Sequence, residues 1–141
     1  MIIVDLRNSK EGWSDSSDLW IVSDSTADFT AFRQLISDIV CSTTEMVSLR
    51  SQTHVFELRT PITEVELIAT QQNNAGVHRG DGGAKIVWES TQEEWKFTLA
   101  KMDELMRGQG HQYFDYDKLT IIVSYMEGLT ARLRAEQISG S

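Results

Sequence analysis

One short segment, GHQYFDYD at residues 110–117, brings together groups that could carry out acid–base or metal chemistry. Alternate side chains of a strand point to the same side, so His111, Tyr113, Asp115 and Asp117 would share one face. An imidazole and two carboxylates on one face could bind a divalent ion or exchange protons with a substrate. The spacing matches no specific metal-binding signature such as His-Glu-x-x-His.

The same segment also fits an ordinary hairpin strand, and we favour this interpretation. Phe114 and Tyr116 alternate with the polar set and would face the core, which leaves the polar side chains toward water. Asp115 and Asp117 would then flank a turn. The alternative function is a small metal-dependent hydrolase or nuclease that uses His111, Asp115 and Asp117.

Residues 76–90, GVHRGDGGAKIVWES, contain four glycines within eight residues and an Arg-Gly-Asp triplet. A phosphate-binding loop leads into a helix N-terminus, whereas Gly82 and Gly83 lead into a strand-like segment with no Gly-Lys-Ser/Thr. Arg-Gly-Asp acts as an adhesion signal only outside the cell, and we expect no export. Asp81–Gly82 is a strong turn dipeptide, so the pattern predicts a polar loop that turns between two strands.

The single cysteine, Cys41, is the candidate for nucleophilic chemistry. A catalytic cysteine needs a base and surroundings that favour the thiolate. Cys41 follows a predicted helix, whose C-terminal end disfavours an anion. We therefore expect a buried structural thiol.

A fourth candidate is KEGWSDSSD at residues 10–18, where carboxylates surround Trp13. An aromatic ring among Glu11, Asp15 and Asp18 could anchor a basic partner. The simpler alternative is a solvated loop whose tryptophan packs back onto the domain. We expect the other three tryptophans, Trp20, Trp88 and Trp95, to lie in the core.

Three helices are predicted from apolar periodicity and capping residues. Residues 27–40 carry an apolar stripe of Phe29, Phe32, Leu35 or Ile36, and Ile39, with a cap among residues 24–26. The second helix starts at a capping box, Ser90 to Glu93, and stops at Arg107–Gly108. A short helix at 129–137 and a frayed tail at 138–141 complete the chain.

Strands are predicted wherever apolar and polar residues alternate, and the only proline, Pro61, separates two of them. This alternation is typical of half-exposed antiparallel strands. We predict a single α+β domain over residues 1–141, with a mostly antiparallel sheet and two main helices on one face. The predicted strands are 2–6, 18–22, 54–59, 64–69, 84–89 and a hairpin over 111–126 that turns near Asp117.

Composition narrows the function classes. The 141 residues carry 21 acidic and 13 basic side chains, a net charge of -8. Phosphate binding needs Lys and Arg, so we expect no direct contact with nucleic acid. The charge also argues against anionic lipid, and no apolar run is long enough to cross a membrane. We expect a cytoplasmic location, because one cysteine cannot form an internal disulfide and no leader pattern is visible. The sequence leaves the oligomeric state open, and we favour a monomer.

The C-terminal half, from WESTQEEWKFTLAKMDEL through GHQYFDYD to LTIIVSYMEG, resembles small bacterial immunity proteins of polymorphic toxin systems, including contact-dependent growth inhibition. Several of those families have a W-x-S-type helix start, a Gly-His-Gln-Tyr-like strand and a last strand that ends in Ser-x-x-Glu. The resemblance covers residues 84–128. The matching residues are Trp88, Ser90, Trp95, Gly110, His111, Gln112, Tyr113, Asp115, Val123, Ser124 and Glu127.

The resemblance implies a non-enzymatic protein that binds one cognate toxin domain, often a nuclease with a basic surface, and blocks its active site or substrate groove. We therefore expect no catalytic residues, no metal ion and no cofactor. Acidic loops and one sheet face would pair with the partner's Lys and Arg around aromatic anchors. A third hypothesis is a small ligand-binding or adaptor domain. The predicted partner-binding residues are Trp13, Asp15, Asp18, Asp81, Tyr113, Asp115 and Asp117.

Overall fold

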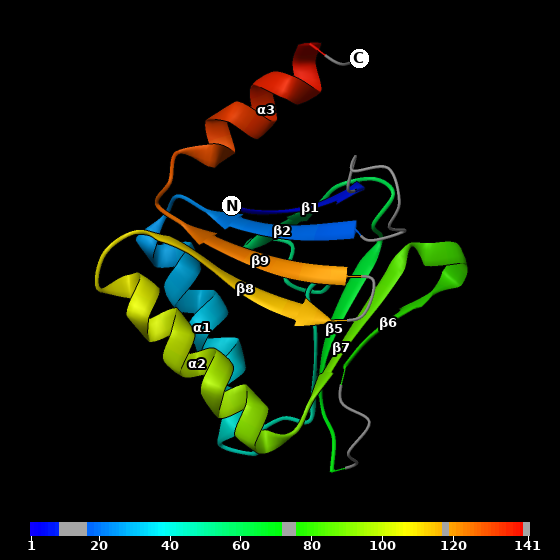
Figure 1. The fold of residues 1–141 in the computed structure, drawn as a ribbon, viewed down its shortest axis with the longest axis vertical. Helices are drawn as coiled ribbons and strands as arrows, with labels where there is room; N and C mark the ends of the chain where they lie inside the picture. The colour runs from blue at the N-terminus through cyan, green and yellow to red at the C-terminus, as the bar shows by residue number, and fades with distance from the viewer. Residues whose placement is uncertain (9–16, 72–75, 117–118, 140–141) are drawn as a thin grey trace.

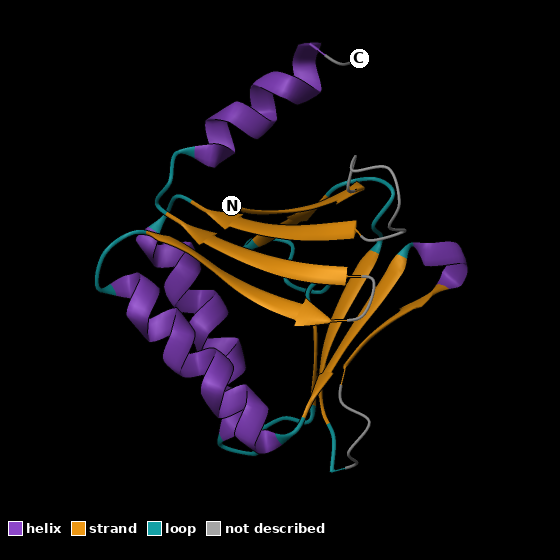
Figure 2. Ribbon diagram, viewed as in Figure 1, coloured by secondary structure: helices purple, strands orange, loops and turns teal. Residues whose placement is uncertain are grey.

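The computed structural model describes residues 1–8, 17–71, 76–116 and 119–139, which form one α+β domain with two mixed sheets (Figures 1 and 2). The predicted fold class is therefore confirmed. The elements are β1 (Ile2–Asn8), β2 (Ser17–Ser23), α1 (Thr26–Val40), β3 (Met46–Ser48), β4 (Phe56–Leu58), β5 (Glu64–Ala69), β6 (Gly76–Gly80), a 3₁₀ turn η1 (Asp81–Gly83), β7 (Lys85–Ser90), α2 (Gln92–Met106), β8 (Gly110–Tyr116), β9 (Leu119–Tyr125) and α3 (Leu129–Ser139).

The larger sheet has five strands in the order β4-β1-β2-β9-β8, and the smaller has four in the order β3-β5-β7-β6. The β1–β2 and β8–β9 neighbours are antiparallel hairpin partners, as predicted for the second pair. The two hairpins meet through a parallel pairing of β2 with β9. Such pairing joins segments distant in sequence, so alternation within each strand could not reveal it. We predicted one sheet, whereas the chain forms two, because β3, β5, β7 and β6 pair among themselves.

Helices α1 and α2 lie side by side on one face of the five-stranded sheet, as predicted, while α3 projects from the opposite side (Figure 1). Ser25 caps α1 by accepting a hydrogen bond from the Asp28 N–H at 3.3 Å. The predicted apolar stripe is buried. Its members are Phe29, Phe32, Ile36 and Ile39.

The capping box of α2 lies one residue later than predicted. Thr91 is the N-cap, and its hydroxyl accepts from the Glu94 N–H, while the Glu94 carboxylate accepts from the Thr91 N–H. Ser90 cannot fill this role because it is the last residue of β7 and is fully buried. The helix ends at Met106, next to the predicted stop.

Two short strands differ from the sequence-based expectation. Residues 76–80, predicted as loop, form β6 and pair antiparallel with β7. Their glycines and exposed His78 and Arg79 hide the strand pattern, because β6 is an edge strand with little to bury. The predicted turn follows at Asp81–Gly83, where Gly82 and Gly83 have φ of 67° and 93°. The three-residue β3 was not predicted.

Cys41 is exposed, which corrects the expectation of a buried thiol. The residue is the C-cap of α1, with φ -81° and ψ 4°. A helix turns about 100° per residue, so Cys41 lies about 200° around the axis from the buried Ile39. The thiol therefore points away from the apolar stripe.

The main core joins both sheets to the inner side of α1 and α2, and Trp88 lies near its centre. Its ring is 5.0 Å from that of Trp95 and 5.5 Å from that of Phe114. The Trp88 indole N–H donates to the Tyr116 hydroxyl at 2.8 Å. Burial raises the pKa of Tyr116, so this hydroxyl stays neutral. Trp20, predicted as core, is only partly buried and lies on the other side of the sheet.

Candidate functional site

The face of the five-stranded sheet opposite α1 and α2 carries Asp18, Tyr113 and Asp115 of the candidate residues, and we call it the outer face. Side chains alternate along each strand, and the pairing register aligns them in rows across the strands. The outer face consists of Ile3, Asp5, Arg7, Asp18, Trp20, Val22, His111, Tyr113, Asp115, Thr120, Ile122 and Ser124.

An aromatic row crosses three strands of the outer face. Tyr113 on β8 lies opposite Ile122 on β9, which lies opposite Trp20 on β2. Ile122 is buried, whereas the Tyr113 ring is 57% exposed. A large exposed aromatic beside a buried aliphatic offers contact area at low entropic cost, because its surroundings are already ordered.

An acidic row lies next to the aromatic one. Asp115 is opposite Thr120, which is opposite Asp18, which is opposite Arg7. The Thr120 hydroxyl donates to the Asp115 carboxylate at 3.0 Å and holds it in place. Asp115 is exposed and Asp18 half-buried. The strands thus place two carboxylates on the same face of the sheet as Tyr113.

A third row holds a polar network that sequence reasoning did not assign to a site. Glu127 bridges two strands: one carboxylate oxygen lies 2.9 Å from His111 Nδ1, and the other accepts from the Ser124 hydroxyl at 2.6 Å. In a nucleophilic triad the imidazole contacts the hydroxyl. Here both groups contact the carboxylate instead, so the network orients His111 and does not activate Ser124.

The orientation of His111 connects this network to the aromatic row. Its ring packs edge-on against Tyr113, with ring centres 5.0 Å apart. Because Nδ1 faces Glu127, Nε2 is left for another contact. The signal for this network in the sequence was the Ser-x-x-Glu spacing of Ser124 and Glu127, at the end of the strand that pairs with the His111 strand.

The outer face contains three of the seven predicted partner-binding residues: Asp18, Tyr113 and Asp115. Asp81 belongs to the other sheet, at the turn between β6 and β7, so it is not part of this face. Trp13, Asp15 and Asp117 lie outside the described residues. Among the residues that the structure describes, no group of three His, Cys, Asp or Glu side chains could hold a metal ion.

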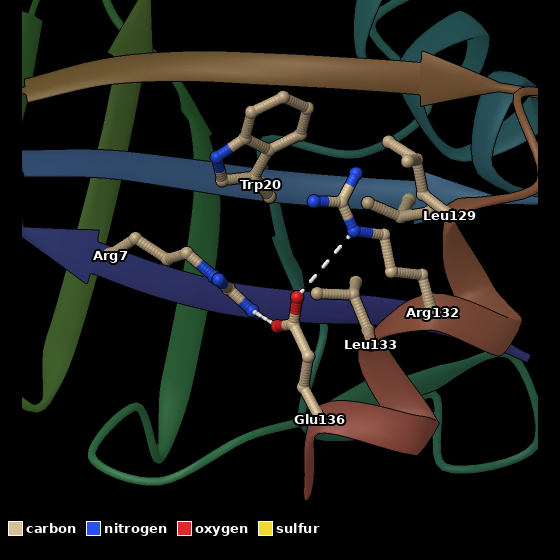
Figure 3. A pocket seen from close by; sticks show the side chains of 7 residues that line it. Arg7, Trp20, Leu129, Arg132, Leu133 and Glu136 are labelled. Carbon is tan, nitrogen blue, oxygen red and sulfur yellow. Dashed lines mark hydrogen bonds and ion pairs between the residues drawn. The ribbon is translucent and has the colours of Figure 1, made fainter.

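A cavity of about 190 Å³ lies between α3 and the outer face (Figure 3). Its wall includes the Trp20 ring, Leu129 and Leu133, and Arg7 and Arg132 meet Glu136 across it. The Arg7 guanidinium holds the pKa of Glu136 below its usual value. Ligand pockets are typically about 300–1,000 Å³, and the charges here already pair with one another. The residues that line this cavity therefore serve mainly to attach α3 to the outer face.

The start of α3 is fixed by Asp24, which accepts from the N–H groups of Gly128 at 2.9 Å and Thr130 at 2.7 Å. Burial raises the pKa of Asp24, but hydrogen bonds from Thr130 and Gly128 lower it more, so the net pKa is below its usual value. The helix is thus anchored at its first turn and again at Leu133, which packs against Ile3 and Val22. Together these contacts cover one end of the outer face.

The sequence matches no protein-family model, and it matches none of the curated proteins to which it was compared. Over the described ranges, each helix is too short or too polar to cross a membrane.

Proposed function

We propose that this chain is an immunity protein that binds a cognate bacterial toxin domain and neutralises it by covering its active site or substrate groove. The observation that carries the proposal is the outer face, where the exposed Tyr113 ring lies beside the Asp18 and Asp115 carboxylates in a chain of net charge -8. The resemblance of residues 84–128 to immunity proteins supports the same function.

The physical logic is that of a charged, aromatic-anchored interface. Aromatic side chains are enriched among the residues that dominate binding free energy. Carboxylates around such an anchor attract a basic partner, raise its association rate and repel acidic competitors. A nuclease that binds phosphate must carry Lys and Arg, so an acidic face suits such a toxin and occupies the same surface as its substrate.

The test is co-expression with the protein encoded immediately upstream, with a tag on this chain alone. The proposal predicts a stoichiometric complex that survives moderate salt, together with rescue of cells from the partner's toxicity. Tyr113→Ala should weaken both, while Met46→Ala, at an equally accessible residue of the smaller sheet, should weaken neither. A chain that gives neither complex nor rescue is not an immunity protein for that partner.

A further inference from the structure

β8 is a terminal strand of the five-stranded sheet. One side of it pairs with β9 along its whole length, and no other strand within the described ranges pairs with its second side. An edge strand of seven residues presents unpaired N–H and C=O groups, which can accept a strand from another chain. The β8 edge can therefore pair with a strand of another protein if the neighbouring surface is complementary to that protein.

A groove of about 410 Å³ runs between this edge and the first turns of α2. Phe97 of α2 and Tyr113 of β8 stand in its wall, and these are the two most exposed large apolar side chains among the described residues, at 59% and 57%. Exposed apolar groups gathered in one concavity mark interaction sites more often than scattered ones do. The lining residues are Glu93, Glu94, Phe97, Thr98, Tyr113, Phe114, Asp115 and Tyr116.

The residues that line the groove carry net negative charge, although Lys101 of α2 lies 5.2 Å from the centre of the Phe97 ring. Of the described residues that line it, three are carboxylates and none is Lys or Arg. Glu94 closes the capping box of α2, Asp115 accepts from Thr120, and the exposed Glu93 lies 3.2 Å from Lys96. A second copy of this chain would bring the same three carboxylates against these, and like charges placed against one another in an interface are destabilising. A basic segment of a different protein gains attraction instead.

We propose that the groove beside β8 receives an extended, Lys- or Arg-bearing segment of the partner protein, which adds as a sixth strand to the sheet. Main-chain hydrogen bonds to β8 would supply affinity, and an apolar side chain between Phe97 and Tyr113 would supply specificity. This binding mode rests on the proposed function, because it describes how the same toxin domain is held. It extends the contact from the outer face around the sheet edge onto α2.

The experiment is amide hydrogen exchange on this chain, free and in complex with the co-purified upstream-encoded protein. Strand addition predicts that amides of β8 become protected, while the terminal strands β3 and β6 of the smaller sheet exchange as in the free chain. Protection of the outer-face strands β2 and β9 without β8 would overturn the edge mode and leave the proposed function standing. Failure to form any complex would overturn both.

A side-chain test separates the groove from the outer face. Phe97→Ala should weaken the complex at least about tenfold, because Phe97 is the apolar anchor on the α2 side of the groove. Because Phe97 is 59% exposed, its truncation should leave the fold intact, and a melting temperature equal to that of the parent chain checks this. Met46→Ala is the matched control. The groove proposal is refuted if the Phe97→Ala chain binds as tightly as the parent and the amides of β8 are not protected in the complex.

Discussion

The two faces of the five-stranded sheet are built from the same strands but differ in polarity and in how far helices cover them. The inner face is apolar and lies against α1 and α2, with Ile21 and Val123 at 1% exposure. The outer face carries aspartates, a histidine and an exposed tyrosine, and α3 covers part of it. Strand alternation produces this division, because neighbouring residues point to opposite sides.

The comparison leads to the prediction that stability depends mainly on the inner face, and partner binding on the exposed residues of the outer face. Substitutions on the inner face should change the free energy of unfolding, whereas those at exposed residues of the outer face, such as Tyr113, should change binding. The first of the following four predictions tests this separation directly, and the other three measure how firmly the helices are attached, from the largest expected effect to the smallest.

The largest effect is expected at Phe32, which is fully buried and packs edge-on against Phe56 with ring centres 5.4 Å apart. Phe32→Ala should lower the free energy of unfolding by about 3–5 kcal/mol, through lost burial and a cavity. Tyr113→Ala on the outer face should change it by no more than about 0.5 kcal/mol. Urea denaturation of both variants measures the loss in the free energy of unfolding. Equal losses for the two variants would contradict the predicted difference between the two faces.

Leu133 tests how firmly α3 is attached to the outer face. Leu133 is 8% exposed and packs against Ile3 and Val22 in a small cluster. Leu133→Ala should cost about 2 kcal/mol, at the low end for a leucine because the site lies near the surface. Hydrogen exchange should show α3 opening while β9 stays protected. If β9 loses protection equally, α3 is part of the main cooperative unit.

Asp24 is expected to contribute about 1 kcal/mol as the cap of α3. Its pKa is lowered in the folded chain, so its contribution is present above the unfolded value of 3.8 and is lost as the pH falls through the lower folded value. The difference in unfolding free energy between the parent and Asp24→Asn should therefore shrink as the pH drops below 3.8. A difference that grows in acid would contradict the assigned hydrogen bonds.

The smallest effect is expected at the Arg33–Asp103 ion pair, which joins α1 to α2 at the surface. The Arg33 hydrogen bond lowers the pKa of Asp103. Both side chains are about a third exposed, so solvent screens the pair and Asp103→Asn should cost only about 0.5 kcal/mol. Thermal melts at low and high salt measure it, and a large, salt-independent loss would show a structural role beyond charge.

Local patterns were enough to predict the elements with a strong period. The stripe of α1 from Phe29 to Ile39 and the β8–β9 hairpin are confirmed. Where little side-chain area is buried, as in β6, the pattern carried no signal. The burial of Cys41 was predicted wrongly, because the residue is the C-cap of α1 and lies away from the stripe that ends at Ile39.

The candidate site could be predicted only in part. Tyr113 and Asp115 share a strand face, which alternation reveals. Their alignment with Trp20 and Asp18 depends on the parallel pairing of β2 with β9, which no local pattern encodes. The position of Phe97 in a groove could not be predicted for a different reason. An exposed aromatic on a helix forms the wall of a groove only when the edge of a sheet lies beside it.

The most direct test of the central claim is calorimetric titration of the co-purified partner into this chain and its Tyr113→Ala variant. An outer face that binds the toxin domain predicts a dissociation constant at least about tenfold weaker for Tyr113→Ala, with Met46→Ala unchanged. Equal affinity of all three chains for the partner would show that the outer face is not the binding surface.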